Sequence, residues 1–171
     1  MIIWINGAFG AGKTTTASKL QNLLPGSFIY DPEEAGFFIR GNAPKSFSEG
    51  DFQDIPLWRE INYLMLKTLA QSPTTIIVPM TLINPNYYNE IIGKLLADGI
   101  DIRHFILYID KPTLIKRLMQ RSFGFIDKEK FAIDAIDRCM YAFENHITEI
   151  KIPADTKSAK DIALEIKELI Q

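Results

Sequence analysis

The residues with the clearest chemical potential lie within the first fourteen positions. Gly7, Gly10, Gly12, Lys13 and Thr14 match the pattern G-x-x-x-x-G-K-[ST]. The glycines permit backbone angles that a Cβ disfavours, so main-chain N–H groups can close around an anion. Lysine supplies a mobile positive charge, and a threonine hydroxyl is a suitable ligand for Mg²⁺. The pattern therefore predicts a loop that binds the phosphates of a nucleotide.

The segments on both sides of this loop have the character that such a loop requires. Residues 2–5 are continuously apolar and predict a buried strand, and residues 13–24 predict a helix that ends before Pro25. The helix N-terminus then faces the anion with its N–H groups and its dipole. We predict ATP and Mg²⁺ as cofactors, a catalytic role for Lys13 and a metal-binding role for Thr14. The predicted cofactor-binding residues of the loop are Gly7, Ala8, Phe9, Gly10, Ala11, Gly12, Lys13, Thr14 and Thr15. The alternative interpretation is a flexible glycine-rich turn with an incidental lysine.

Composition excludes several classes of protein. The 171 residues are 47% hydrophobic and 23% charged, which predicts one globular domain spanning residues 1–171. The net charge is −2 and there is no long run of Lys and Arg, so nucleic acid is not the expected main partner. The single cysteine, Cys139, rules out an intrachain disulfide. With no membrane span or signal peptide in the pattern, we expect a cytoplasmic protein. A homodimer remains open.

Strands and helices alternate along the chain, which predicts an α/β protein with a parallel sheet covered on both faces. Helix 55–70 is expected to bury one apolar face, formed by Leu57, Trp58, Ile61, Leu64, Met65 and Leu69. Residues 31–54 are the least regular part and are predicted to form an acceptor-side segment. Residues 117–130, which contain an interruption around Gly124, are predicted to form a lid segment.

Charged residues near the ends of the predicted strands and helices are the remaining candidates for chemistry. Asp31 follows the second strand at the edge where α/β sheets bind ligands, and is predicted to orient an acceptor hydroxyl. The alternative is a turn-forming aspartate before proline. Arg117 and Arg121 share one helix face and are predicted to clamp phosphates, and Arg138 is predicted to face the same site. For all three arginines the alternative is a solvated position.

Other polar residues are expected to be structural. Arg40, Asp54 and Arg59 are weaker acceptor-side candidates, each expected to be structural or solvated. His104 and His146 have no metal-ligand partners at useful spacing. The third strand is followed by Pro79-Met80-Thr81, without the carboxylate that normally supports the metal. The acid for this role is therefore unidentified.

Several longer stretches carry a family resemblance. The opening through Thr14, Tyr30-Asp31-Pro32-Glu33, Asp51-Phe52-Gln53, Val78-Pro79-Met80-Thr81 and Ile136-Asp137-Arg138-Cys139 resemble the bacterial ATP-binding tunicamycin-resistance family. The resemblance covers most of the chain to about Cys139. It implies a three-layer P-loop NTPase fold of the nucleoside/nucleotide-kinase type, with a five-stranded parallel sheet in the order 2-3-1-4-5. It also implies that Arg117 and Arg121 approach the lid and that Asp155 lies near the adenine.

Three functions compete. The first is a kinase that transfers the γ-phosphate of ATP to a hydroxyl of a small-molecule acceptor, nucleoside-like or an antibiotic. The second is an ATP-dependent protein that binds and sequesters such a ligand without modifying it. The third, a GTPase-like switch, is disfavoured because residues 154–157 read Ala-Asp-Thr-Lys and lack the guanine-specificity sequence N/T-K-x-D.

Overall fold

The computed structural model describes residues 1–121 and 126–171, without the side chains of Ser48 and of residues 121–133. Its strands are β1 (Ile2–Gly7), β2 (Phe28–Ile29), β3 (Ile76–Pro79), β4 (Ile102–Tyr108) and β5 (Ile150–Pro153). All strand pairs are parallel, and the order across the sheet is β2-β3-β1-β4-β5. The predicted fold class and strand order are confirmed.

The helices connect these strands and cover the sheet. They are α1 (Lys13–Leu23), α2 (Pro32–Asn42), α3 (Lys45–Ser48), the 3₁₀ turn η1 (Phe52–Asp54), α4 (Pro56–Leu69), α5 (Pro85–Tyr88), the π-helical turn η2 (Asn89–Gly93), α6 (Lys94–Ala97), α7 (Lys111–Arg121), α8 (Ile126–Asn145) and α9 (Ala159–Leu169). Residues 85–97 thus form three consecutive helical pieces with a π turn in the middle. Such turns are rare and occur inside helices.

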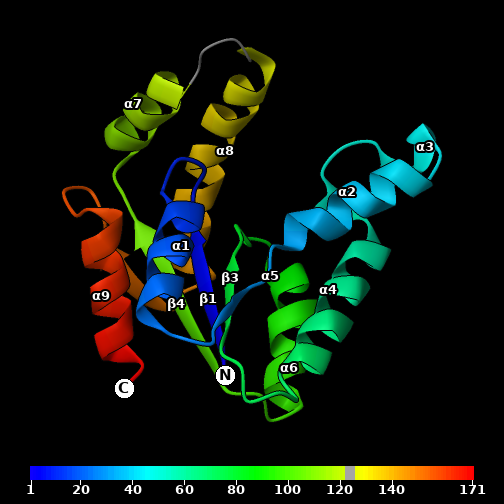
Figure 1. The fold of residues 1–171 in the computed structure, drawn as a ribbon. Coiled ribbons are helices and arrows are strands. Elements are labelled where there is room, and N and C mark those ends of the chain that lie inside the picture. The colour runs from blue at the N-terminus through cyan, green and yellow to red at the C-terminus, as the bar shows by residue number, and fades with distance from the viewer. Residues whose placement is uncertain (122–125) are drawn as a thin grey trace.

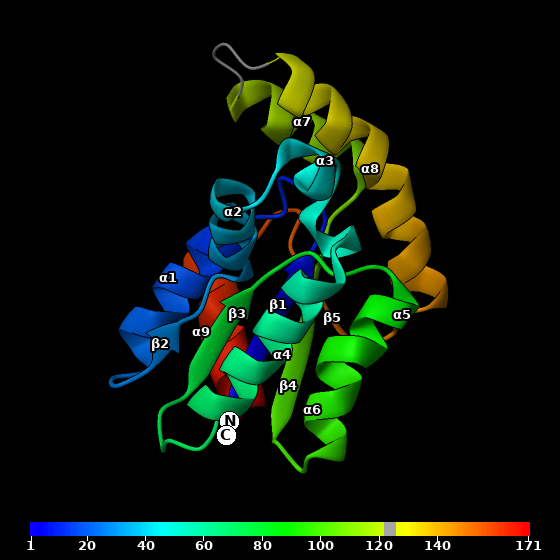
Figure 2. The same cartoon turned by 90° about the vertical axis from the view of Figure 1, so that its right-hand side faces the viewer.

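The sheet separates two apolar cores. Alternate side chains of β1 point to opposite faces, so Ile3 and Ile5 belong to one cluster while Ile2 and Trp4 belong to the other. The first cluster lies against α1, α8 and α9, and the second lies against α4 and α6 (Figure 1). Figures 1 and 2 place α2 and α3, and also α7 and the first part of α8, beyond the carboxyl ends of the strands. The loop predicted to bind phosphate lies at this same end.

The buried face of α4 differs from the predicted one. Trp58 is buried as expected, but Leu57, Leu64 and Met65 are exposed. The helix buries Arg59, Asn62 and Leu66 instead. Asn62 accepts a hydrogen bond of 2.7 Å from the Tyr30 hydroxyl and donates one of 2.8 Å to the carbonyl of Trp58. The prediction of the apolar face was wrong because α4 buries polar side chains that have hydrogen-bond partners, and this orientation leaves Leu57, Leu64 and Met65 exposed.

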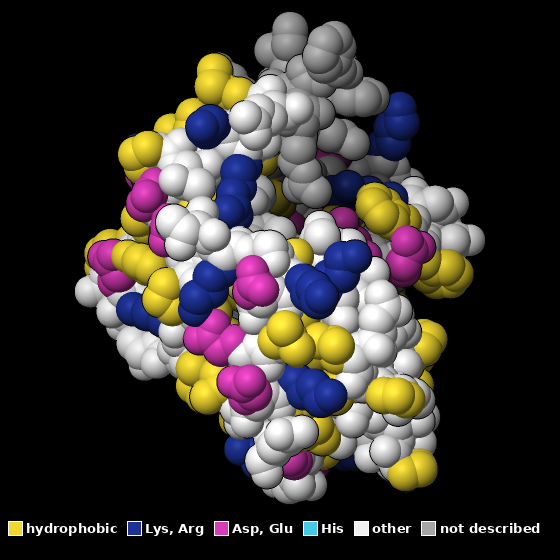
Figure 3. All heavy atoms as spheres, turned by 60° about the vertical axis from the view of Figure 1, so that its left-hand side comes forward, with side chains coloured by type: hydrophobic (Ala, Val, Ile, Leu, Met, Phe, Trp, Pro, Cys, Tyr) yellow, Lys and Arg dark blue, Asp and Glu magenta, His cyan; other side chains and the backbone are white. Residues whose placement is uncertain are grey.

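Two further observations concern the outer surface. Within the described ranges, every helix is too short or too polar to cross a membrane. On the face shown in Figure 3, Lys and Arg side chains alternate with Asp and Glu side chains rather than forming one basic patch. That face lacks the concentrated positive charge typical of nucleic-acid binding.

Candidate functional site

The loop between β1 and α1 leaves the first turn of α1 available to an anion. α1 begins after Gly12, which is left-handed (φ 93°), and no side chain caps the helix, whereas α2, α5 and α9 each have a side-chain cap. The Nζ atom of Lys13 donates hydrogen bonds to the carbonyl oxygens of Gly7 (3.0 Å) and Ala8 (3.2 Å). Helix N–H groups and an ammonium group therefore meet at one point, as phosphate binding requires.

The loop is tight at one end and open at the other. A Cβ atom at Gly7 would lie 3.0 Å from the Cβ atom of Ala11, but one at Gly12 would meet nothing within 4 Å. Thr14 and Thr15 are exposed at the open end. These residues fit a phosphate chain, and the accessible Thr14 hydroxyl fits a metal ligand.

Asn6 connects the start of this loop to the two neighbouring strands. Its Oδ1 atom accepts hydrogen bonds from the backbone N–H groups of Gly7 (2.9 Å) and Leu82 (3.0 Å). Because both contacts are backbone donors, the accepting atom must be the oxygen. Its Nδ2 atom then donates to the carbonyl of Leu82 (2.7 Å) and to Nε2 of His104 (3.3 Å). All four contacts are buried, so Asn6 fixes the loop's position on the sheet.

His104 completes this junction as a neutral ring. Burial lowers the pKa of His104 to about 3. Since Nε2 accepts from Asn6, the neutral ring carries its proton on Nδ1. The ring stacks on Tyr88 at a centroid distance of 5.7 Å, and the Tyr88 hydroxyl donates to Glu149 (2.7 Å). The structural role predicted for His104 agrees with this placement.

The lowered pKa of His104 predicts an acid-sensitive fold. The unfolded chain takes up the proton near pH 6.5 and the folded chain only near pH 3, so stability is lost as the pH falls through this window. Between pH 7 and 5.5 this group should remove about 1.2 kcal/mol of unfolding free energy. Urea denaturation at both pH values should show this loss in the wild type and in a His146→Gln control, but not in His104→Gln. An equal loss in all three proteins would contradict the assignment.

A cavity of about 450 Å³, which we call the α2 cavity, opens beside the loop. This volume is in the range of small-molecule sites. Aromatic and apolar side chains form part of its wall, and carboxylate, amide and hydroxyl groups form the rest. The lining residues are Phe9, Glu33, Phe37, Arg40, Gly50, Asp51, Phe52, Gln53, Met80 and Thr81. Phe9 belongs to the phosphate-binding loop itself, so the cavity and the loop share one wall.

The two carboxyl groups of this wall, Glu33 and Asp51, have pKa values above their ordinary range, so their charged forms are disfavoured. Burial, together with the negative charge of Asp31, raises the pKa of Glu33, although the positive charge of Lys13 opposes the shift. Burial likewise raises the pKa of Asp51, against a backbone hydrogen bond from Gln53. Raised carboxylate pKa values in a cavity are typical of functional sites.

Asp31 lies next to this cavity as the cap of α2. Its Oδ1 atom accepts the backbone N–H of Glu33 at 3.0 Å. Among the described residues, Glu33 rather than Asp31 lines the α2 cavity. The role of Asp31 at the acceptor hydroxyl therefore stays a prediction, and Glu33 joins it as a candidate.

A second cavity, of about 340 Å³, lies on the other side of the loop and is called the α9 cavity. It is lined by Gly10, Ala11, Gly12, Thr15, Thr16, Arg117, Gln120, Lys157, Ala159 and Ile162. The guanidinium of Arg117 donates to the carbonyls of Ala154 (3.0 Å) and Asp155 (3.2 Å). The Asp155 carboxylate accepts the backbone N–H of Asp110 at 2.7 Å. Arg117 thus holds the loop at residues 154–155 and lines the same cavity as the phosphate-binding loop, and its role at the phosphates stays a prediction.

The other predicted arginines have different outcomes. Arg138 lines a smaller cavity of about 170 Å³, the α8 cavity, together with Phe9, Asp51, Thr81 and other residues. It therefore lies in the same cavity as Phe9 of the loop, and its role at the nucleotide stays a prediction. The side chain of Arg121, and residues 122–125 of the predicted lid segment, lie outside the described residues.

One of the weaker candidates, Arg59, is held by several hydrogen bonds. Arg59 is buried, and its Nε atom donates to Glu90 at 2.7 Å while another nitrogen donates to the carbonyl of Gln53 at 2.6 Å. Gln53 in turn donates to the carbonyl of Thr81 at 3.1 Å. Arg59 therefore supports the wall of the α2 cavity from behind, in the structural role expected for it.

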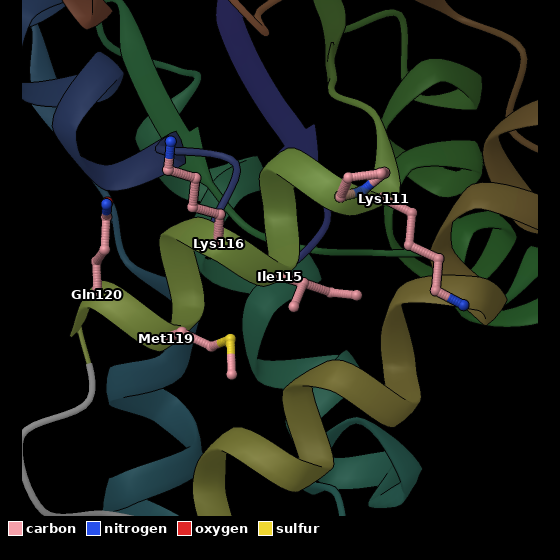
Figure 4. Close-up of a pocket in the computed structure, with 6 residues that line it drawn as sticks. Lys111, Ile115, Lys116, Met119 and Gln120 are labelled. Atoms are coloured by element: carbon pink, nitrogen blue, oxygen red, sulfur yellow. The ribbon is translucent and has the colours of Figure 1, made fainter.

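A further cavity, of about 630 Å³, is an apolar groove along α7 (Figure 4). Its described lining comes from α7 and includes Ile115, Lys116 and Met119. In Figure 4 the side chains of Ile115 and Met119 point away from those of Lys116 and Gln120. The groove shares none of the described loop residues, so its size does not make it the chemical site.

The end of β3 shows what stands where an acid was sought. Thr81 is buried, and its hydroxyl donates to the carbonyl of Gly7 at 2.8 Å. In the part of the chain that the structure describes, no three His, Cys, Asp or Glu side chains gather as metal ligands. Mg²⁺ sites with phosphate ligands need only one or two protein groups, so Thr14 remains a fitting ligand.

Sequence reasoning missed Glu33, Asp51 and Gln53 as site residues. Each lies in the segment 31–54, which was assigned to the acceptor side only as a whole. No local motif marks these side chains, although Glu33 and Asp51-Phe52-Gln53 were part of the family resemblance.

The comparisons with known proteins agree with this geometry. Residues 2–146 match the family model described as an AAA domain. The structure is similar to that of the tunicamycin resistance protein of Deinococcus radiodurans, with a TM-score of 0.82 and 26% sequence identity over 99% of this chain and 94% of that one. The predicted resemblance is confirmed. No protein of curated function matches the sequence.

More distant similarities concern the fold alone. A gluconokinase from Sinorhizobium meliloti has a TM-score of 0.65 and 12% identity, over 95% of this chain and 87% of that one. A deoxyadenosine kinase from M. mycoides has a TM-score of 0.61 and 18% identity, over 99% and 98%. The fold is therefore one that P-loop kinases share.

Proposed function

Because the chain belongs to the AAA-domain family, we propose that it is an ATP-dependent kinase that transfers the γ-phosphate to a hydroxyl group of a small molecule. One observation carries the proposal: the phosphate-binding loop stands between two cavities and forms part of the wall of each. The α9 cavity would take the nucleoside part of ATP, and the α2 cavity would take the acceptor. Both reactants would then meet at Lys13.

The residues have distinct roles in this proposal. The acceptor oxygen attacks the γ-phosphorus, the bond to the β-phosphate oxygen breaks, and ADP leaves. The helix N–H groups of α1 and Lys13 hold the phosphates, and a carboxylate at the start of α2 accepts the proton of the hydroxyl. Mg²⁺, with Thr14 as a ligand, supplies neutralisation of phosphate charge when bound. Arg138 faces the loop from α8 and would add positive charge.

The test is mass spectrometry of a reaction panel. Purified protein and Mg-ATP are incubated with nucleosides, sugars and tunicamycin, and each sample is scanned for a phosphorylated product. A product that is absent with Lys13→Ala supports the kinase. If ADP forms no faster with any compound and tight-binding compounds are recovered unchanged, the proposal is wrong.

The carboxylate that accepts the proton can be identified by two substitutions. Asp31→Asn keeps an oxygen that can cap α2, and Glu33→Gln keeps the shape of the cavity wall. We expect Glu33→Gln to lower kcat by about 10²-fold, since it lines the cavity, and Asp31→Asn to have a smaller effect. The reverse ranking in steady-state assays would return the role to Asp31. Melting temperatures would show that both variants are folded.

A second candidate function is binding without transfer. It is favoured by one observation, the absence of a carboxylate at the end of β3, where Thr81 bonds to the loop instead. A sequestering protein would bind its ligand in an ATP-dependent way. It would need no residue to accept a proton from the ligand's hydroxyl group. Stoichiometric binding of a compound that is recovered unmodified would support this candidate. So would binding of that compound by Glu33→Gln with the same affinity as by the wild type.

A further inference from the structure

The α2 cavity carries two carboxylates in its wall, those of Glu33 and Asp51. Glu33 comes from the first turn of α2, and Asp51 precedes η1. One oxygen of Asp51 accepts the backbone N–H of Gln53 at 2.9 Å. Asp51 also lines the adjoining α8 cavity, so it stands where the two spaces meet. A ligand in the α2 cavity must therefore lie beside acidic groups.

The cationic groups near these acids have their own contacts. Arg40 lines the α2 cavity, but its guanidinium donates to the carbonyl of Gly50 at 2.6 Å and lies over the ring of Phe52 at 5.3 Å. Lys13 donates hydrogen bonds to carbonyls of the phosphate-binding loop, and Arg138 lines the adjoining α8 cavity. Arg40 is thus held on the cavity wall as a planar, stacked group.

Four apolar side chains also line the α2 cavity. They are Phe9, Phe37, Phe52 and Met80, and Phe37 is 52% exposed. A planar or apolar portion of a ligand would cover these side chains. Its hydroxyl groups would then reach Glu33, Asp51 and the amide of Gln53.

We propose that the α2 cavity selects a neutral or cationic hydroxyl compound with a planar or apolar portion, and discriminates against phosphorylated and carboxylated acceptors. This inference rests on the proposed kinase function, because it assigns the cavity to the acceptor. An anionic acceptor would add a third negative charge beside Glu33 and Asp51, in a place where burial already disfavours the charged carboxylates.

The experiment uses matched pairs of compounds with and without an anionic group: uridine and its 5′-monophosphate, adenosine and its 5′-monophosphate, and glucose and gluconate. Binding is measured by thermal shift in the presence of Mg²⁺ and a non-hydrolysable ATP analogue. We expect the non-anionic member of at least one pair to bind about tenfold or more tightly than its anionic partner. Equal or tighter binding of the anionic members would overturn the proposal, as would the absence of binding by every compound.

Variants separate this inference from the kinase proposal. Glu33→Gln with Asp51→Asn should reduce the discrimination within a pair by about tenfold, while Glu34→Gln, an exposed neighbour on α2, should leave it unchanged. Unchanged discrimination in the double variant would overturn the proposal that Glu33 and Asp51 select against anionic acceptors. The shift produced by Mg-ATP alone reports on nucleotide binding in every variant. Its absence in the wild type would refute the proposed function, whereas its presence with wrong selectivity would refute only this inference.

Discussion

Replacing Lys13 by alanine is expected to abolish nucleotide binding while leaving the protein folded. In the wild type, Mg-ATP at 100 times its Kd should add about 2.7 kcal/mol of stability, which is a rise of several degrees in Tm. Lys13→Ala should lose this rise, because it removes the ammonium group that lies against the phosphate-binding loop. Phosphotransfer, where the acceptor is known, should fall by about 10²-fold or more.

The folded state should tolerate this change. Lys13 is half-buried and bonds to two backbone carbonyls, so its removal should cost about 1 kcal/mol of unfolding free energy. Lys19→Ala is the matched control, since Lys19 lies exposed on the same helix. Thermal-shift curves for the three proteins with and without Mg-ATP decide the question. A full ATP-dependent shift in Lys13→Ala would remove the phosphate-binding role from this loop.

The fold could be predicted from the sequence because its signals are local. The strand at residues 2–5 is apolar on both faces, and the glycine pattern requires one conformation between a strand and a helix. The last helix likewise begins with a capping box formed by Ser158 and Asp161, three positions apart. Such features depend on neighbours within a few positions.

The features that could not be predicted depend on distant residues. Arg59 is buried on α4 because Glu90 and the carbonyl of Gln53 receive its hydrogen bonds, and Glu90 is 31 positions away. The same reasoning applies to Arg117. Its spacing from Arg121 places both on one helix face, but it does not predict the hydrogen bonds that Arg117 donates to carbonyls in the loop at residues 154–155. The spacing of residues along a helix predicts which face of the helix a side chain lies on, but not which group it forms a hydrogen bond with.

The α2 cavity illustrates the same limit for the candidate site. The irregular segment 31–54 could be assigned to the acceptor side as a whole, from its place after the second strand. Glu33 and Asp51 line the same cavity because the chain returns from α2 through α3 to η1. No spacing rule links these two carboxylates, so their shared cavity required the structure.

Asn6→Ala is expected to be the most destabilising single substitution that we propose. The side chain bonds to the N–H groups of Gly7 and Leu82, to the carbonyl of Leu82 and to His104, all in buried positions. Alanine would leave these groups without the Asn6 partner inside the protein. Since each buried unsatisfied group costs about 1–3 kcal/mol, the total loss should be about 3–5 kcal/mol of unfolding free energy.

Urea denaturation of Asn6→Ala at pH 7 measures this loss, with Asn22→Ala as the control because Asn22 is exposed on α1. The variant should also lose the acid-dependent destabilisation assigned to His104, if removal of Asn6 admits water to the ring and returns its pKa toward 6.5. A loss below about 1 kcal/mol would mean that the loop is positioned mainly by Thr81 and the glycine geometry. The predicted large loss would instead identify Asn6 as the residue through which β3 and β4 fix the phosphate-binding loop.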